Sequence, residues 1–323
     1  MKYQEIAALK RPVSRIVLGT SSPLFTGGGN ADGLLQEAQA LGINCLDTAR
    51  EYRESERVIG RYLAGSGRRE DWVILSKCCH PVMAYIPRVS ERCAREDLAR
   101  SLEYLGTDHI DLYLLHRDDP LVEVGRVVDF MNRLMDEGHI RAYGGSNWSA
   151  ARVKAANEYA QNHGLRGFEA VSPHYSLGRQ RHDPWGNGCR TLTGAKHREE
   201  REYFEQTQLP VFCWSSLCAG VFSGKLKSTE NGQIFKKFGL NPWWGYDCRD
   251  NYARLARCEE LAAEKNVSVA QLTLAWILDD PLRTFPVAAP TSVQRLRDVA
   301  AAADLELSPA ERSYLNLETE ARA

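Results

Sequence analysis

The chain has 323 residues and a formal net charge of −1, with 41 Lys and Arg against 42 Asp and Glu, so it has no basic field to attract nucleic acid or an anionic membrane. The polar N-terminal segment does not resemble a signal peptide, and no apolar run approaches the roughly 20 residues that a membrane-spanning helix needs. Nine cysteines without regular spacing indicate free thiols in a reducing compartment, so we expect a cytoplasmic protein that acts on a small molecule, and no pattern indicates its oligomeric state.

Short apolar, β-branched runs recur along the chain, with helical patterns between them. Their hydrophobicity is continuous rather than alternating, as strands buried on both faces require. We predict strands over Arg15–Gly19, Asn44–Asp47, Trp72–Lys77, Asp111–His116, Arg141–Gly145, Gly167–Val171, Val211–Ser215 and Thr284–Ala288.

The stretches between these strands carry helix-starting and helix-ending signals. One amphipathic stretch ends at Gly106, as a helix ends at a C-terminal glycine. Ser149 is the expected N-cap of another helix, which should stop at Gly164. The pair Ser308 and Pro309 predicts the start of the final helix, with a cap followed by a first-turn proline.

Parallel strands that alternate with helices predict an α/β fold, specifically a (β/α)₈ TIM barrel rather than a doubly wound sheet. The side chains with potential catalytic roles fall at the C-terminal ends of the predicted strands, where barrel active sites lie. Their placement favours a sheet that closes into a barrel over an open sheet. No linker divides the chain, so we predict a single domain over residues 1–323. Two long connections, over about 178–198 and about 226–252, should form loops that shape the mouth of the site.

Four residues at predicted strand exits form a proton-handling set: Asp47, Tyr52, Lys77 and His116. A phenol has an unperturbed pKa of about 10, too high for efficient proton transfer near neutral pH. We expect the ammonium of Lys77 to lower the pKa of Tyr52, and Asp47 to keep Lys77 in place and charged. His116 would donate a hydrogen bond to a substrate oxygen on which charge develops.

The segments that carry these residues resemble the aldo-keto reductase family, over nearly the whole chain from Val13 to Leu315. GINCLDTAREYRESERVIGRYL is similar to the family's Asp-Thr-Ala…Tyr…Ser-Glu segment, and WVILSK, DLYLLH and IRAYGGSNWS supply its Lys, its His and its Ser-Asn pair. VFCWSSLCAGVFSGKL resembles the segment that follows the seventh strand. The resemblance implies reversible hydride transfer between a nicotinamide dinucleotide and a carbonyl or alcohol, without a metal.

The resemblance also implies the role of each residue. Tyr52 would be the general acid in reduction and the base in oxidation, tuned by Lys77 and Asp47, while His116 positions the carbonyl. Trp214 would stack on the nicotinamide ring. The cofactor-binding residues that the resemblance implies are Gly19, Thr20, Ser21, Asp47, Ser146, Asn147, Ser172, Trp214, Ser215, Leu217, Gly220, Lys225 and Arg295.

The chain departs from the family pattern at the cofactor site. Ser172 stands where the family commonly has Gln, and a hydroxyl reaches less far than an amide. Ala289 or its neighbours stand where a basic residue usually grips the 2′-phosphate, and Val299 aligns with an Asn that contacts adenine. Arg295 remains, and it can stack on adenine or bind a 2′-phosphate. NADP, as NADPH, is therefore the expected cofactor, and NAD stays open.

Substrate contacts are expected from His80, Arg117, Trp185, Trp243 and Trp244, which lie in segments that follow strands. Aromatic faces beside hydrogen-bonding groups would suit a polyhydroxylated substrate such as a sugar or its lactone. The sequence therefore suggests a polar carbonyl substrate.

Two further features have competing interpretations. The run Cys78, Cys79, His80 contains metal-ligand types, but adjacent cysteines lack the spacing that lets two thiolates share one zinc ion. We expect this run to be a pocket wall with reduced thiols and no metal. His174 would either touch substrate or cofactor or be hydrogen-bonded within its own loop.

The alternative function belongs to a different class. A dinucleotide-binding regulatory subunit resembling the potassium-channel β-subunits would share this fold and these motifs, although an N-terminal inactivation segment is not evident. A hydrolytic barrel that used Asp118 and Asp119 is disfavoured, because adjacent residues rarely flank a scissile bond from two sides.

Overall fold

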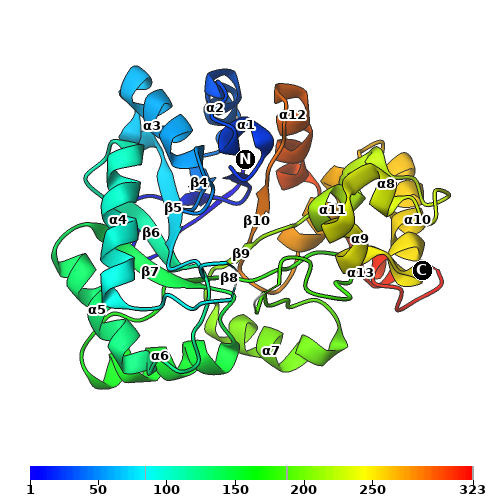
Figure 1. Cartoon of the computed structure of the whole chain (residues 1–323). Helices are drawn as coiled ribbons and strands as arrows, with labels where there is room; N and C mark the ends of the chain where they lie inside the picture. Colours follow the sequence, from blue (N-terminus) through cyan, green and yellow to red (C-terminus); the bar gives the residue numbers. More distant parts are fainter. Residues whose placement is uncertain (84, 187, 322–323) are drawn as a thin grey trace.

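A closed barrel of parallel strands forms the centre of the protein (Figure 1). The computed structural model describes residues 1–83, 85–186 and 188–321. Around the barrel, the described strands follow the order β10-β3-β4-β5-β6-β7-β8-β9, and every neighbouring pair is parallel. The predicted (β/α)₈ TIM barrel is therefore confirmed. That the whole chain is a single domain stays a prediction.

The barrel strands lie close to their predicted positions. They are β3 Val17–Gly19, β4 Cys45–Asp47, β5 Val73–Cys78, β6 Ile110–Leu115, β7 Ile140–Ser146, β8 Ala170–Ser172, β9 Val211–Cys213 and β10 Thr284–Ala288. Strand β9 is shorter than predicted, because Ser215 adopts a φ of 51°, which no strand residue can adopt. Trp214 and Ser215 thus lie in the loop beyond the strand.

Helices pack outside the barrel and connect successive strands (Figure 1). They are α1 Pro23–Thr26, α2 Asp32–Ala40, α3 Ser55–Ser66, α4 Glu91–Leu105, α5 Val124–Asp136, α6 Ala150–Asn162, α7 Arg198–Thr207, α8 Ile234–Phe238, α9 Leu240–Tyr246, α10 Arg249–Glu264, α11 Val269–Leu278, α12 Val293–Ala301 and α13 Pro309–Leu315.

The predicted helix signals are confirmed. The Ser149 side chain accepts a hydrogen bond from the backbone N–H of Arg152, and Ser308 forms a reciprocal capping box with Glu311. Gly106 ends α4 with a φ of 62°, a conformation that glycine adopts without strain.

The inside of the barrel is filled by side chains, so it is a core and not a channel. Buried residues from all eight strands form this core, and Ile6 and Leu9 from the N-terminal segment pack against it. The same segment contributes β1 Tyr3–Gln4 and β2 Val13–Ser14, an antiparallel pair that precedes the first barrel strand. The N-terminal end of the barrel is therefore covered, and ligands must approach the opposite end.

The long connections differ in part from the prediction. The connection over 178–198 is largely irregular, as predicted, and its residue Asn187 lies outside the described residues. The connection over 226–252 was predicted to be a loop, but α8, α9 and the start of α10 occupy much of it. The sequence does not reveal α8 and α9 because they are only one or two turns long, and α9 also contains proline and glycine. No helix in the described part of the chain is long and apolar enough to cross a membrane.

Candidate active site

The structure brings the four predicted proton-handling residues together at the C-terminal end of the barrel. The Nζ atom of Lys77, on β5, donates to Oδ2 of Asp47 at 2.7 Å and to the carbonyl of Thr48 at 2.9 Å. The same Nζ lies 5.0 Å from the ring centroid of Tyr52. The Tyr52 ring in turn meets the His116 ring edge-on, with centroids 5.9 Å apart.

The loop that carries Tyr52 is fixed by buried hydroxyl groups. The hydroxyl of Ser55 contacts those of Thr48 and Thr20, at 3.0 and 2.7 Å. The backbone N–H of Tyr52 donates to the carbonyl of Ala49, and its own carbonyl accepts from Ser55. Because these bonds tie the start of α3 to β3 and β4, the phenol is held over Lys77 by the scaffold.

Lys77 is charged at neutral pH in this arrangement. Burial alone would lower the pKa of Lys77, but Asp47 and Tyr52 outweigh it and hold that pKa above its ordinary value. The expectation that Asp47 keeps Lys77 charged agrees with this direction.

Lys77 lowers the pKa of Tyr52 as expected, but the net shift is upward, so the expectation of an acidified phenol is wrong. Burial raises the pKa of Tyr52 above its ordinary value, and the neighbouring Lys77 lowers it only in part. The physical reason is that the site removes the phenol from water, which disfavours the phenolate more than one ammonium favours it. Tyr52 is therefore a protonated phenol at neutral pH, able to donate a proton.

His116 is neutral. Burial lowers the pKa of His116 well below its ordinary value, and the cations Arg117 and Lys77 lower it further. Its side chain is buried at the end of β6, and its Nδ1 atom has no hydrogen-bond partner among the described residues. A neutral imidazole can still orient a carbonyl through one N–H.

The predicted carboxamide-binding residues lie side by side across β7 and β8. The hydroxyl of Ser146 donates to the carbonyl of Ser172 at 2.9 Å, and Nδ2 of Asn147 donates to the carbonyl of His116 at 3.2 Å. Oδ1 of Asn147 accepts from the backbone N–H of Arg190. These side chains already tie strand ends together, whereas the buried hydroxyl of Ser172 has no partner among the described residues.

Trp214 lies directly beyond β9 with part of its surface exposed. The ring of His174 packs on it at 5.0 Å. His174 itself is fully buried, with Nδ1 2.7 Å from the hydroxyl of Thr191 and Nε2 within reach of Ser176 and Tyr246. Burial lowers the pKa of His174 to about 3. Its ring nitrogens are thus engaged, which supports the loop-bonded interpretation of this histidine.

The segment after β9 has an irregular backbone. Ser215 has a positive φ of 51°, and Gly220 one of 99°. Lys225 at the end of this segment is exposed, as is Arg295 in the first turn of α12, where its guanidinium donates to the hydroxyl of Thr291. Of the remaining predicted positions, Gly19 is the last residue of β3, Thr20 and Ser21 follow it, and Leu217 follows β9.

These features fit a dinucleotide. An aromatic ring with an exposed surface, an unpartnered buried hydroxyl and exposed cations are groups that could hold a nicotinamide, its carboxamide and the phosphates. The donor set thus agrees with the type of cofactor that the sequence suggested.

The predicted substrate residues are only partly brought together. His80 contacts the His116 ring, with centroids 4.7 Å apart. Arg117 is buried, donating to the carbonyl of His116 at 2.8 Å and to Sγ of Cys189 at 3.0 Å, so it links β6 to the 178–198 connection. Trp185 is about half-exposed in that connection.

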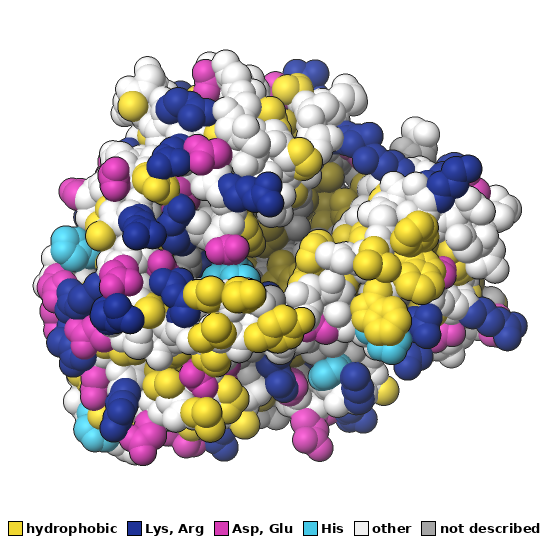
Figure 2. All heavy atoms as spheres, in the orientation of Figure 1, with side chains coloured by type: hydrophobic (Ala, Val, Ile, Leu, Met, Phe, Trp, Pro, Cys, Tyr) yellow, Lys and Arg dark blue, Asp and Glu magenta, His cyan; other side chains and the backbone are white. Residues whose placement is uncertain are grey.

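Trp243 and Trp244 belong to an exposed hydrophobic cluster over α8 and α9, together with Phe235 and Leu240. Figure 2 shows hydrophobic atoms there beside a hollow in the surface. Trp244 also stacks on His182 at 4.3 Å. The ring contacts of these tryptophans are thus with one another and with neighbouring loops.

Several groups at this end are engaged in structural contacts. Asp118 accepts three bonds from Arg152, at 3.3, 3.0 and 2.9 Å, and Asp119 accepts from the backbone N–H of Leu121. A pair of free carboxylates for hydrolysis is therefore not present here. No cluster of three or more potential metal ligands occurs among the described residues.

Two kinds of residue that support the site were not predicted from the sequence. Thr48 contributes a carbonyl to Lys77, and no side-chain pattern reveals a carbonyl ligand. Asp97, on α4, accepts a bond from the backbone N–H of Cys79 at 2.8 Å and pairs with Arg88. A buried aspartate within an amphipathic helix was the available signal.

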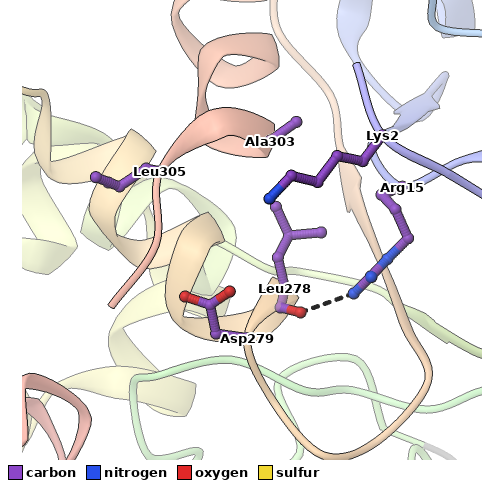
Figure 3. A pocket seen from close by; sticks show the side chains of 6 residues that line it. All are labelled: Lys2, Arg15, Leu278, Asp279, Ala303 and Leu305. Carbon is purple, nitrogen blue, oxygen red and sulfur yellow. Dashed lines mark hydrogen bonds between the residues drawn. The ribbon is translucent and has the colours of Figure 1, made fainter. Parts of the chain in front are cut away.

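A small pocket lies at the other end of the barrel (Figure 3). Its side chains come from Lys2, Arg15, Leu278, Asp279, Ala303 and Leu305. Arg15 precedes β3, and its guanidinium donates to the carbonyls of Leu278 and Thr284. This pocket is thus separated by the barrel core from Tyr52 and Lys77.

Comparison with known proteins gives one consistent result. The aldo/keto reductase family matches residues 16–316. An uncharacterized oxidoreductase of Mycobacterium bovis is 30% identical over 98% of this chain and 92% of its own length. The aldo-keto reductase YhdN of Bacillus subtilis is 27% identical (87% and 82%), and an aldo-keto reductase of Fusarium vanettenii is 26% identical (87% and 79%).

Proposed function

Since the chain belongs to the aldo/keto reductase family and is an NAD(P)(H)-dependent oxidoreductase, we propose that Tyr52 is its general acid when a carbonyl is reduced to an alcohol. The bound dinucleotide supplies or accepts the hydride. The residues of the chain bind and orient the reactants and handle the proton.

The observation that carries this proposal is the contact between Lys77, Asp47 and Tyr52. A protonated phenol donates its proton to the oxygen on which negative charge develops, and the phenolate that remains lies beside a charged ammonium. Asp47, 2.7 Å from that ammonium, holds it in place. In the oxidative direction the same phenolate would take the proton back.

His116 would assist the same proton transfer by binding the substrate oxygen beside Tyr52. It lies against the Tyr52 ring, and because it is neutral it orients the substrate oxygen without donating a full proton. This assigns the positioning of the carbonyl to His116 and the proton transfer to Tyr52.

For the cofactor we propose NADPH, with NADH as the competing choice. Arg295 is an exposed guanidinium at the first turn of α12, suited to a 2′-phosphate. Trp214 would stack on the nicotinamide, and the hydroxyl of Ser172 would meet its carboxamide. Lys225, with Ser215 and its neighbours, would lie along the pyrophosphate.

For the substrate we propose a polar carbonyl compound such as a sugar, in line with the sequence-based expectation. His80 supports this proposal best, because its ring is partly exposed beside His116. Arg117, Trp185, Trp243 and Trp244 would contribute to the walls, although Arg117 already donates two bonds within the protein. We also propose a cytoplasmic location, which the nine free cysteines support.

One experiment tests the proposed function. Purified protein is titrated with NADPH and with NADH while tryptophan fluorescence is recorded, because docking beside Trp214 should quench its emission. The loss of NADPH absorbance is then followed with a panel of sugar carbonyls and aromatic aldehydes. We expect tighter binding of NADPH and turnover of at least one carbonyl class. Dinucleotide binding without turnover of any carbonyl would favour a regulatory subunit instead.

A further inference from the structure

Two imidazoles lie side by side at the C-terminal end of the barrel. The ring of His80 meets that of His116 at 4.7 Å between centroids and an interplanar angle of 71°. On the other side, the ring of Tyr52 meets His116 at 5.9 Å and 77°. His116 is therefore held between two ring edges.

The orientation of His116 has no hydrogen bond from Nδ1 to fix it among the described residues. A functional histidine is usually oriented by a bond from the ring nitrogen that does not face the ligand. The last torsion of a histidine is broad and roughly two-fold, so an unbonded ring can turn and exchange a nitrogen for a carbon. Packing must then determine which ring atom faces the carbonyl.

The backbone beside His80 is held in an uncommon conformation. Cys79 is fully buried and has a φ of 58°, a backbone conformation that residues other than glycine rarely adopt. Its backbone N–H donates to Oδ2 of Asp97 at 2.8 Å. Arg88 donates two bonds to the same carboxylate, at 3.0 and 3.1 Å, and lies 3.4 Å from the carbonyl of His80. A partly buried ion pair thus supports this turn.

The His80 ring is also fixed from its outer side. Its Nδ1 lies 3.1 Å from the carbonyl of Pro81 and 4.0 Å from a carboxylate oxygen of Glu51. With Nδ1 directed to this backbone carbonyl, the ring keeps one orientation against His116. A strained turn, a partly buried ion pair and a ring hydrogen bond therefore converge on one imidazole.

We propose that His80 is a positioning residue that holds the ring of His116 in the orientation needed to bind the substrate carbonyl. This inference rests on the proposed function, since His116 has a task only if a carbonyl binds beside Tyr52. The ring contact, rather than the nitrogens of His80, performs the positioning. A flat ring of similar size should therefore replace it.

Two substitutions test this proposal: His80→Ala removes the ring, and His80→Phe keeps a ring and removes both nitrogens. Wild type and both variants are compared for NADPH affinity by tryptophan fluorescence and for kcat and KM with a carbonyl that the wild type reduces. We expect His80→Ala to lower kcat about tenfold, with NADPH affinity unchanged. His80→Phe should keep kcat within about twofold of wild type, while its KM for a polar carbonyl rises because the imidazole nitrogens are gone. Unchanged NADPH affinity also reports that each variant is folded.

A spectroscopic readout accompanies the kinetics and does not depend on turnover. In protein with ¹⁵N-labelled histidine, the ring signals of His116 should be sharp in wild type and in His80→Phe, and broadened or shifted in His80→Ala. A kcat of His80→Ala equal to wild type, or a His80→Phe variant as slow as His80→Ala, would overturn the inference. Absence of turnover in the wild type would instead count against the proposed function, and the ring signals would still test the contact.

Discussion

Two buried aspartates at opposite ends of the barrel are held in different ways. Asp111, near the N-terminal end of β6, accepts bonds from Arg69 at 2.8 Å and from the backbone N–H of Ile74 at 2.9 Å, and lies 3.2 Å from Nε of Arg141. Asp47, at the C-terminal end of β4, has the single ammonium of Lys77. One end of the barrel thus has an aspartate with two cationic partners, and the other an aspartate with one.

The pKa values of the two carboxyls move in opposite directions. Burial raises the pKa of Asp111, but His109, Arg69 and the amide of Ile74 outweigh it and hold that pKa below its ordinary value. Burial raises the pKa of Asp47, and Lys77 offsets this only in part. Arginines cannot lose their protons, whereas a lysine beside a phenol can take part in proton transfer. The N-terminal end therefore holds its carboxylate between two arginines, whereas the C-terminal end holds one ammonium beside the phenol that, under the proposed function, would donate the proton.

Of the substitutions that test the difference between the two ends of the barrel, Lys77→Met should have the largest effect. We expect kcat for carbonyl reduction to fall by about a thousandfold, because the phenolate of Tyr52 loses the charge that stabilises it. Steady-state kinetics would measure the effect. Lys154→Met removes an exposed lysine on α6 and should leave kcat unchanged. A Lys77→Met variant with the kcat of wild type would remove the ammonium from the mechanism.

The substitution Asp111→Asn tests the N-terminal end of the barrel. We expect the free energy of unfolding to fall by about 3 kcal/mol at neutral pH, because the partly buried guanidinium of Arg69 loses its charged partner. Denaturant unfolding would measure the loss, and kcat of the folded variant should not change. The exposed Asp136→Asn is a matched control with little expected effect.

The stability that Asp111→Asn loses relative to wild type should depend on pH. The pKa of Asp111 is lower in the folded state, so its contribution to stability is present above the ordinary aspartate pKa and is lost as the pH falls through the folded value. The stability difference between wild type and Asp111→Asn should therefore shrink under acid conditions. A difference that grows with acid would contradict this account.

The pH dependence of activity should reflect the raised pKa of Tyr52. The reduction rate should be nearly constant from about pH 6 to about pH 9, because the phenol stays protonated, while oxidation should rise up to about tenfold per pH unit. His116 should cause no inflection near neutrality, because its pKa lies well below the ordinary value. Initial rates in both directions would show this, and a reduction rate that falls between these limits would argue against Tyr52 as the acid.

The smallest effect should follow from Ser149→Ala. This residue lies at the catalytic end of the barrel, but its hydroxyl caps α6. We expect a loss of about 1 kcal/mol in stability, with kcat unchanged. Thermal unfolding and kinetics would check it, and Ser149→Asp, which restores a cap, should recover the stability. A fall in kcat would mean that Ser149 is closer to the chemistry than the structure indicates.

Most of the fold could be predicted from the sequence, because strands buried on both faces have continuous apolar runs and the helices carry caps such as Ser149 and Ser308. The two short helices α8 and α9 could not, since tertiary packing, not local propensity, stabilises helices of this length. The four proton-handling residues were found from their strand-end positions and their motif spacing.

The electrostatics of the site could not be predicted to the same degree. The motif places Lys77 near Tyr52, but only the structure shows that burial outweighs the ammonium and raises the phenol pKa. The contact between His80 and His116 depends on the positive φ of Cys79 and on its bond to Asp97, which is eighteen residues away in the chain. Sequence spacing does not encode such a contact.

The proposed mechanism depends most on Tyr52 as the proton donor. Tyr52→Phe, loaded with NADPH and mixed rapidly with a saturating carbonyl substrate, tests it most directly, with Tyr104→Phe as a control outside the site. We predict that NADPH binds Tyr52→Phe with the affinity of wild type, and that hydride transfer slows by at least about a hundredfold. Transfer at the rate of wild type, or loss of NADPH binding in a folded variant, would contradict the claim.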